Sequence, residues 1–248
     1  HGKGGAAPSI DTAMHTLVDS KHVDHLHPDS GIAIATAVDG ENLTKKIFGE
    51  KVIWVPWRRP GFQLGLDIAK IKEKNPQAIG CILGGHGITA WGETSTQCER
   101  NSLKIIRDAE DYIKKNGKAK PFGSKVAKFA PLSKTKREQR ASELAPILRG
   151  LASTDKPMLG HFSDDPRVLE FLESSKMGKL AQLGTSCPDH FLRTKVKPMV
   201  LDTAPDADLE KVKKRLTELH QKYRAEYAAY YKKYAKKDSP AMRGADPA

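Results

Sequence analysis

The sequence predicts a layered α/β or α+β protein in which helices cover a sheet. In the first half of the chain, short apolar segments of strand length alternate with helical patterns. Of the 248 residues, 38% are hydrophobic and 29% are charged, which is ordinary for a globular protein and excludes collagen-like and wholly disordered chains. A chain of this length can bury a core without disulfides.

Each element of the first half has a local signal. Asn75 followed by Pro76 ends one helix, and Thr94 with Gln97 forms a capping-box pattern at the start of another. The apolar side chains of that last helix recur every three or four residues until Gly117. The expected helices are residues 9–19, 41–48, 62–74 and 94–116, and the expected strands are residues 21–27, 51–55 and 78–83.

Apolar periodicity lapses across residues 117–140, where glycine, proline and lysine indicate a connector. We therefore predict a first domain at residues 1–120 and a connector at 121–140. An accessory α/β region at 141–237 and an exit linker at 238–248 follow. The accessory region is expected to contain strands at 158–162 and 198–201, a short helix at 166–174 and a long helix at 208–236.

Composition also restricts the partners. The sequence contains no apolar run of the roughly 18–20 residues that cross a bilayer and no signal segment, so no membrane association is expected. Three cysteines are too few for a disulfide framework, which favours a reducing, cytoplasmic setting. The net charge of +12 suits nucleic acid or anionic metabolites. Because tyrosines continue the apolar stripe of the last helix, we expect them to pack rather than to bind nucleic acid.

Three histidines form a candidate metal site. His25 and His27 are two residues apart on an expected strand, so their side chains project from one face, opposite Asp24. His86 follows another strand, within Gly84-Gly85-His86-Gly87. Three imidazoles suit zinc with an open position, and also suit cobalt, nickel or iron. The spacing alone is equally compatible with histidines that bind no metal.

Asp11 is the candidate catalytic residue. It precedes His15 by one helical turn, and a carboxylate close to a metal-bound carbonyl can exchange a proton with the substrate. Considered alone, it is also a typical first-turn helix residue that the helix dipole favours.

These residues together resemble the class II aldolase and adducin head family. The resemblance rests on Pro8-Ser9-x-Asp11, followed by His25-Leu26-His27-Pro28 and then Leu83-Gly84-Gly85-His86-Gly87. Residues 22–29 and 184–195 further resemble the aldolase part of bifunctional rhamnulose-1-phosphate aldolase and alcohol dehydrogenase enzymes of rhamnose catabolism.

The resemblance implies a three-layer α/β/α domain with a mixed, largely antiparallel sheet, followed by a smaller α/β region that ends in a long helix. It implies that His25, His27 and His86 are zinc ligands and that Asp11 stands where related aldolases place the glutamate that moves a proton. The implied reaction is zinc-dependent cleavage of a ketose 1-phosphate to dihydroxyacetone phosphate and lactaldehyde. A homo-oligomer is implied as well.

Two parts of the family pattern are expected outside this sequence. A Gly-Asn-Thr-Ser phosphate-binding loop would precede Pro8, and a dehydrogenase half that binds NAD would follow Ala248, so we expect a fragment of a bifunctional enzyme. Within the chain, His190, Arg193 and Lys195 are candidates for holding the substrate phosphate, or are solvated loop residues. The alternatives are a sugar-phosphate epimerase or dehydratase of the same fold and a non-catalytic, adducin-like association module.

Overall fold

The computed structural model describes residues 9–126, 128 and 130–247. It divides into two compact units, each described separately below. The first is His1–Lys118 together with Ser186–His190, and the second is Ala119–Thr185 together with Phe191–Ala248. No helix among the described residues has the length and apolar character needed to span a membrane.

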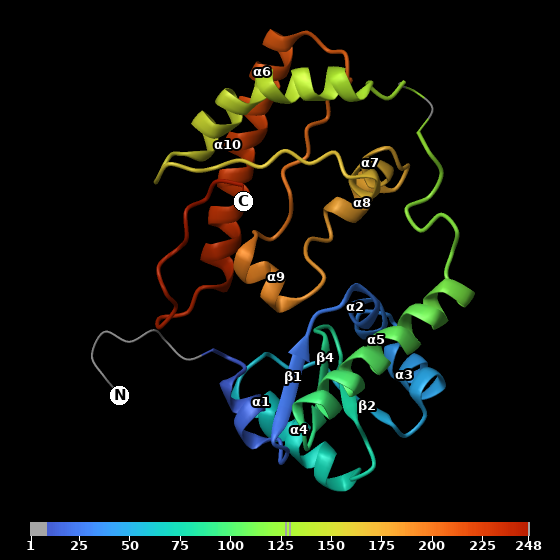
Figure 1. The fold of residues 1–248 in the computed structure, drawn as a ribbon. Coiled ribbons are helices and arrows are strands. Elements are labelled where there is room, and N and C mark those ends of the chain that lie inside the picture. Colours follow the sequence, from blue (N-terminus) through green and yellow to red (C-terminus); the bar gives the residue numbers. More distant parts are fainter. Residues whose placement is uncertain (1–8, 127, 129, 248) are drawn as a thin grey trace. The chain divides into compact units, whose positions relative to one another are not determined.

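The first unit contains a four-stranded sheet with the strand order β1-β4-β3-β2 (Figure 1). β1 and β3 both pair antiparallel to β4, whereas β2 pairs parallel to β3, so the sheet is mixed and largely antiparallel. The elements in chain order are α1 (Thr12–Leu17), β1 (His22–Leu26), α2 (Asp29–Ala35), α3 (Gly40–Phe48), β2 (Val52–Val55), α4 (Phe62–Lys74), β3 (Gly80–Leu83), β4 (Ile88–Gly92) and α5 (Ser95–Asn116).

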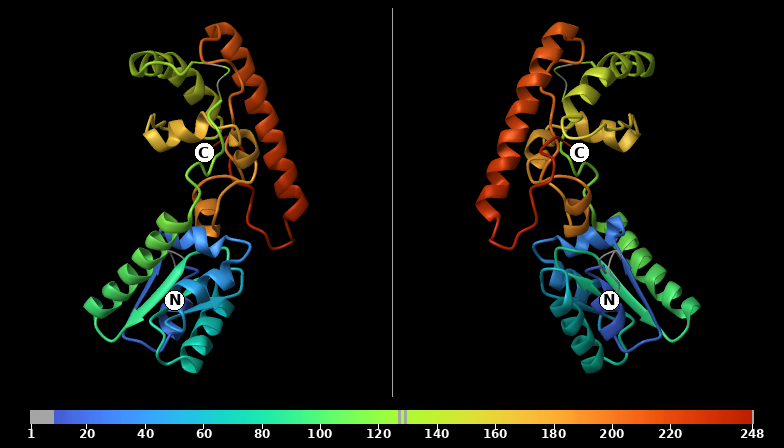
Figure 2. Two further views of the ribbon diagram at one scale, coloured as in Figure 1. Left: turned by 90° about the vertical axis from the view of Figure 1, so that its right-hand side faces the viewer. Right: turned by 90° about the vertical axis from the view of Figure 1, so that its left-hand side faces the viewer.

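Helices cover both faces of this sheet, as the sequence predicts. Side chains alternate along a strand, so Cys81 and Leu83 of β3 pack on one face and Ile82 packs on the other. The face of Cys81 packs against α1 and α4, and the face of Ile82 packs against α2, α3 and α5. The three-layer α/β/α architecture is therefore confirmed, and its layers can be followed in Figure 2.

Most of the expected elements of this unit form within a few residues of their predicted bounds. Thr94 caps α5 by accepting a hydrogen bond from the Gln97 amide at 3.1 Å, and Trp91 is buried with its indole N–H donating to the Ala78 carbonyl. The sequence analysis did not predict α2 or β4. It missed β4 because all five residues of this strand are buried, so the strand lacks the alternation that marks a half-exposed strand.

The second unit is helical. Its elements are α6 (Lys134–Ala152), α7 (Pro166–Leu172), α8 (Met177–Ala181), α9 (Pro188–Arg193), which begins in the first unit, and α10 (Leu209–Tyr234). The long helix expected at the end is confirmed as α10, which is continuous in both views of Figure 2. α6 begins inside the stretch expected to be a connector, because Ser133 caps it and strong helix formers follow.

The two strands expected in this unit are wrong. Residues 158–162 and 198–201 form irregular coil. Leu159 and Phe162 are 92% and 49% exposed, so the apolar pattern of the first segment does not mark a buried strand. Pro198 has no backbone N–H, which weakens the second segment as a strand. An apolar run becomes a strand only where a neighbouring strand supplies hydrogen bonds.

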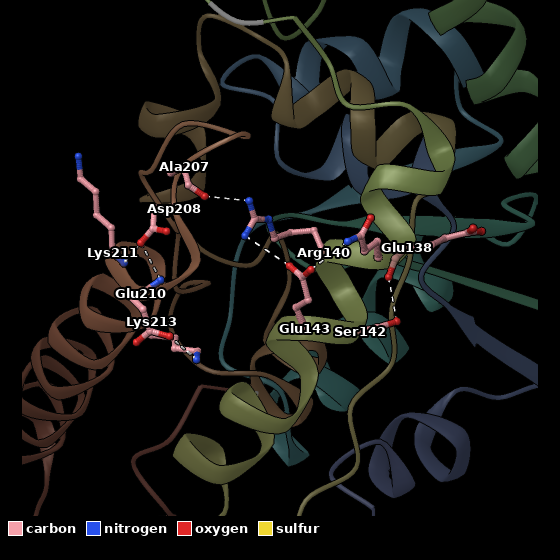
Figure 3. A network of polar contacts seen from close by, with 10 residues as sticks. Glu138, Arg140, Ser142, Glu143, Ala207, Asp208, Glu210, Lys211 and Lys213 are labelled. Carbon is pink, nitrogen blue, oxygen red and sulfur yellow. Dashed lines mark hydrogen bonds and ion pairs between the residues drawn. The ribbon is translucent and has the colours of Figure 1, made fainter.

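A hydrogen bond joins α6 to the residues just before α10. Arg140 of α6 donates to the Ala207 carbonyl at 2.8 Å and also pairs with Glu143 (Figure 3). Asp208 caps α10 by accepting hydrogen bonds from the amides of Glu210 and Lys211. Of these contacts, the Arg140 hydrogen bond joins α6 to the residues before α10, whereas the Asp208 cap stabilises the start of α10 itself.

Candidate metal centre

The first two histidines come from β1 and the residue that follows it. β1 pairs with β4 so that His25 lies opposite Thr89. Asp24 faces the other side of the sheet, where it accepts a hydrogen bond from Ser102 of α5 at 2.7 Å. Strand alternation thus separates Asp24 from His25, as expected from the sequence.

The third histidine lies in the tight turn that joins β3 to β4. The Leu83 amide donates to the Gly87 carbonyl at 2.8 Å, and the His86 amide donates to the Leu83 carbonyl at 2.9 Å. Gly85 has a φ of +67°, which an L side chain rarely adopts, so this turn requires glycine. The turn leaves His86 only 1% exposed, beside the end of β1.

The structure brings the three imidazoles to one point. The Nε2 atom of His25 lies 3.0 Å from Nε2 of His27 and 3.2 Å from Nε2 of His86. The ring centroids are 4.7 to 5.0 Å apart. His86 is far from His25 and His27 in sequence. The antiparallel pairing of β1 with β4 brings its ring close to theirs.

Gly87 makes room for His27. A Cβ atom at position 87 would lie 2.5 Å from Cδ2 of His27 and 2.6 Å from the Leu26 carbonyl oxygen. Real Cβ atoms are essentially never so close to other heavy atoms, and the carbonyl belongs to the backbone of the strand end. Gly87, the last glycine of the motif, therefore allows the ring to approach the turn.

The orientation of His25 is set by the backbone of β4. Its Nδ1 atom lies 2.9 Å from the Ile88 carbonyl oxygen, which can only accept, so Nδ1 carries the proton and Nε2 keeps a lone pair. Burial, followed by the charges of His86 and His27, lowers the pKa of His25 to about 4, against smaller raising effects of the Ile88 hydrogen bond and Asp11. The ring is neutral at neutral pH.

This donor set fits a divalent transition-metal ion. Tetrahedral zinc with nitrogen ligands at about 2.1 Å holds the nitrogens roughly 3.4 Å apart, close to the separations of 3.0 and 3.2 Å found here. A backbone carbonyl that orients the distal nitrogen of a histidine is the usual support of such a ligand. Three histidines leave a coordination position for a substrate.

Asp11 lies near this cluster. It is the residue before α1 rather than part of its first turn, a small correction to the expected helix start at Ser9. Its Oδ2 atom accepts a hydrogen bond from Ser9, whereas Oδ1 is buried and has no hydrogen-bond partner among the described residues. The carboxylate is close enough to raise the pKa of His25. The proton-transfer role of Asp11 stays a prediction.

A second group of ligand-type side chains adjoins the first and was not predicted as such. His27, Cys187 and His190 each offer a ligand atom, and these atoms all lie within 4.8 Å of one another. Cys187 and His190 belong to the first unit, in Ser186–His190. The spacing of the two residues in the sequence was the available signal, but a single cysteine and a single histidine are too common to indicate a metal site alone.

The other two candidates for phosphate binding are Lys195 and Arg193. Lys195 belongs to the second unit, where it is buried, donates to the Gly244 carbonyl and lies 4.6 Å from the ring centroid of Tyr227. With Lys156 and Arg243 it lines a cavity of about 390 Å³. The Arg193 side chain lies outside the described part of the structure. Substrate binding by either residue stays a prediction.

Two family models match the chain. Residues 1–113 match "Class II Aldolase and Adducin N-terminal domain", and residues 139–248 match "Aldolase class II, second domain". All three histidines of the cluster fall in the first match, whereas Cys187 and His190 fall in the second.

Individual proteins resemble parts of the chain. The uncharacterized oxidoreductase YuxG of Bacillus subtilis (strain 168) is 37% identical over 226 residues, which are 90% of this chain and 32% of YuxG. The chain thus spans about a third of that relative. An N-terminal class II aldolase domain from Thermoplasma acidophilum is 27% identical, with a TM-score of 0.38 over 43% of this chain and 48% of the domain. An aldolase II superfamily protein from Pseudomonas syringae is 18% identical, with a TM-score of 0.33 over 43% and 44%.

Proposed function

Because the chain belongs to the class II aldolase and adducin family, we propose that it is a metal-dependent aldolase whose ion is held by His25, His27 and His86. The observation that carries this proposal is the convergence of the three Nε2 atoms, 3.0 and 3.2 Å from His25 to its neighbours. We propose zinc as the ion, since neutral imidazoles and an open fourth position suit it.

The proposed reaction is the cleavage of a ketose 1-phosphate of the rhamnulose type to dihydroxyacetone phosphate and lactaldehyde. The resemblance of residues 22–29 and 184–195 to bifunctional rhamnulose-1-phosphate aldolases supports this substrate. When bound, the ion would supply Lewis-acid stabilisation of the negative charge that develops on the ketose oxygens.

The residues of the chain have separate tasks in this proposal. The Ile88 carbonyl holds the proton of His25 on Nδ1, so that Nε2 is available as a donor atom. Cleavage of the C3–C4 bond turns the C4 hydroxyl into the aldehyde carbonyl and releases its proton, while the electron pair stays on C3 of the dihydroxyacetone phosphate fragment, which then takes up a proton. Oδ1 of Asp11 is the proposed carrier of that proton, because Ser9 engages only Oδ2.

We further propose that this chain is the aldolase part of a larger bifunctional enzyme that forms a homo-oligomer. The name of the Bacillus subtilis relative, an oxidoreductase, supports a partner region with dehydrogenase chemistry, because about two thirds of that relative lie beyond the match. NAD would belong to that partner region and not to the residues described here.

Metal content and cleavage, measured together, test the proposal. The purified protein should hold a transition metal and release an aldehyde from rhamnulose 1-phosphate. His86→Ala should lose both the metal and the cleavage, whereas His22→Ala, at an exposed position on β1, should keep both. Cleavage by the metal-free protein would overturn the mechanism.

The same assay separates the alternatives from the proposed reaction. An isomerised or dehydrated sugar phosphate instead of an aldehyde would identify an epimerase or a dehydratase. A protein that binds no metal and turns over no sugar phosphate would identify a non-catalytic association module.

A further inference from the structure

The segment Ser186–His190 carries two metal-ligating side chains that the proposed aldolase centre does not use. It clusters with the first unit, although the chain on either side of it belongs to the second. Cys187 is only 4% exposed, whereas His190 is exposed. A buried thiol beside an exposed imidazole is chemically unlike a pair of solvated loop residues.

Both side chains lie next to a ligand of the first cluster. The His190 ring lies perpendicular to that of His27, with centroids 6.0 Å apart. The ligand atoms of His27, Cys187 and His190 are all within 4.8 Å of one another, as are those of His25, His27 and His86. His27 belongs to both groups, and ligand atoms at these separations need only small side-chain movements to surround one ion.

We propose that Cys187, His190 and His27 form a second metal-binding group beside the three-histidine centre, so that an ion held there has a thiolate donor. This inference rests on the proposed function for the first three ligands. A mixed nitrogen and sulfur set selects a borderline to soft divalent ion such as zinc or cobalt over magnesium or calcium. The thiol proton passes to solvent when the sulfur binds the ion.

The other two cysteines provide an internal comparison. Cys81 lies within β3 and is completely buried in the apolar core, where burial raises the pKa of its thiol to about 12. Cys98 lies in α5, with its sulfur 3.7 Å from the Ala90 carbonyl oxygen, and burial raises its pKa to about 11. Neither belongs to a group of potential metal ligands among the described residues, so only Cys187 is expected to bind a metal.

Cobalt substitution tests this assignment directly, because Co²⁺ replaces zinc and absorbs light. Co²⁺ added to the metal-free protein should produce visible ligand-field bands and, in addition, a thiolate-to-cobalt charge-transfer band in the near ultraviolet. Cys187→Ser should lose the charge-transfer band and keep the visible bands. His190→Ala should raise the dissociation constant for Co²⁺ at least about tenfold.

The matched control is Cys98→Ser, which removes a buried thiol and should keep the charge-transfer band. Cys187→Ala serves as a second variant, and unchanged tryptophan fluorescence shows that each variant is folded. Visible bands without a thiolate band in the wild-type protein, or a thiolate band that survives both Cys187 variants, would overturn the inference and leave the three-histidine centre intact. No cobalt binding at all would overturn both.

Discussion

Different interactions stabilise the interior of each unit. In the first unit, apolar side chains from both faces of the sheet form two clusters, and Ile82, Ile88 and Ile105 have no exposed surface. In the second unit, every residue of α6 and α7 is described and none is buried. The first unit therefore relies on the hydrophobic effect to a degree that these helices of the second unit cannot.

The second unit compensates with a buried polar network near its C-terminal end. Asp246 is 8% exposed and accepts hydrogen bonds from Thr154, His220 and Arg224, with Nε2 of His220 at 2.9 Å from Oδ1. Thr154 lies just after α6, and His220 and Arg224 belong to α10, so the network ties both to the C-terminal tail. A satisfied network of this kind orients the backbone, but it adds less stability than an apolar core of similar size.

The contrast has a functional consequence. A metal centre requires ligand atoms held within a few tenths of an ångström, and in the first unit the paired strands β1 and β4 and a tight turn position His25, His27 and His86. The four predictions below test the contrast, from the largest expected effect to the smallest.

Ile82→Ala should destabilise the first unit by about 2–5 kcal/mol, because it removes a fully buried side chain between β3 and the helices beneath it. Urea unfolding followed by tryptophan fluorescence measures the loss, since all three tryptophans lie in this unit. Leu148→Ala, at a 38% exposed position of α6, should change the free energy of unfolding of the second unit, followed by circular dichroism, by less than about 0.5 kcal/mol. Equal losses of unfolding free energy in Ile82→Ala and Leu148→Ala would contradict the proposed difference between the two units.

Asp246→Asn should destabilise the second unit by about 1–3 kcal/mol at neutral pH. Burial opposes ionisation of Asp246, but hydrogen bonds from Thr154, Arg224 and His220 outweigh it and lower the pKa of the carboxyl group. The stabilisation is therefore complete above the pKa of the unfolded chain, near 4, and disappears as the pH falls through the lower folded value.

The difference between wild type and Asp246→Asn should accordingly shrink on acidification, measured by urea unfolding with circular dichroism between pH 7 and pH 3. Asp238→Asn, at an exposed position of the same tail, is the control and should show no such pH dependence. A difference that does not change with pH would contradict the prediction.

Gly87→Ala should lower the affinity for zinc at least about tenfold, or roughly 1.4 kcal/mol, because the added Cβ would overlap His27 and the Leu26 carbonyl. A metal-competition titration measures the change. Gly150→Ala, where nothing lies within 4 Å of the added Cβ, should leave zinc affinity unchanged. Wild-type affinity in Gly87→Ala would show that the turn can shift without cost.

Gly150→Ala should itself stabilise the second unit by about 0.5–1 kcal/mol, because alanine loses less backbone freedom than glycine in the interior of α6. Circular dichroism during urea unfolding checks this, and tryptophan fluorescence should show no change in the first unit. A shift in the fluorescence transition instead would mean that the two units do not unfold separately.

Local signals predicted the first unit better than the second. Thr94 and Gln97 at one end of α5 and Gly117 at the other act within a few residues, so the sequence indicates that helix reliably. β4 was missed because a strand buried on both faces has no alternation, and residues 158–162 were wrongly expected to be a strand because apolar character does not reveal whether a partner strand exists.

The sequence by itself determined that His25 and His27, two residues apart at the end of a strand, project to the same side and that a glycine turn carries His86, because both follow from backbone geometry over a few residues. Only the tertiary structure decided that these three rings converge and that Cys187 and His190 lie beside His27. Those proximities come from strand pairing and chain packing between residues distant in sequence, which no local pattern encodes.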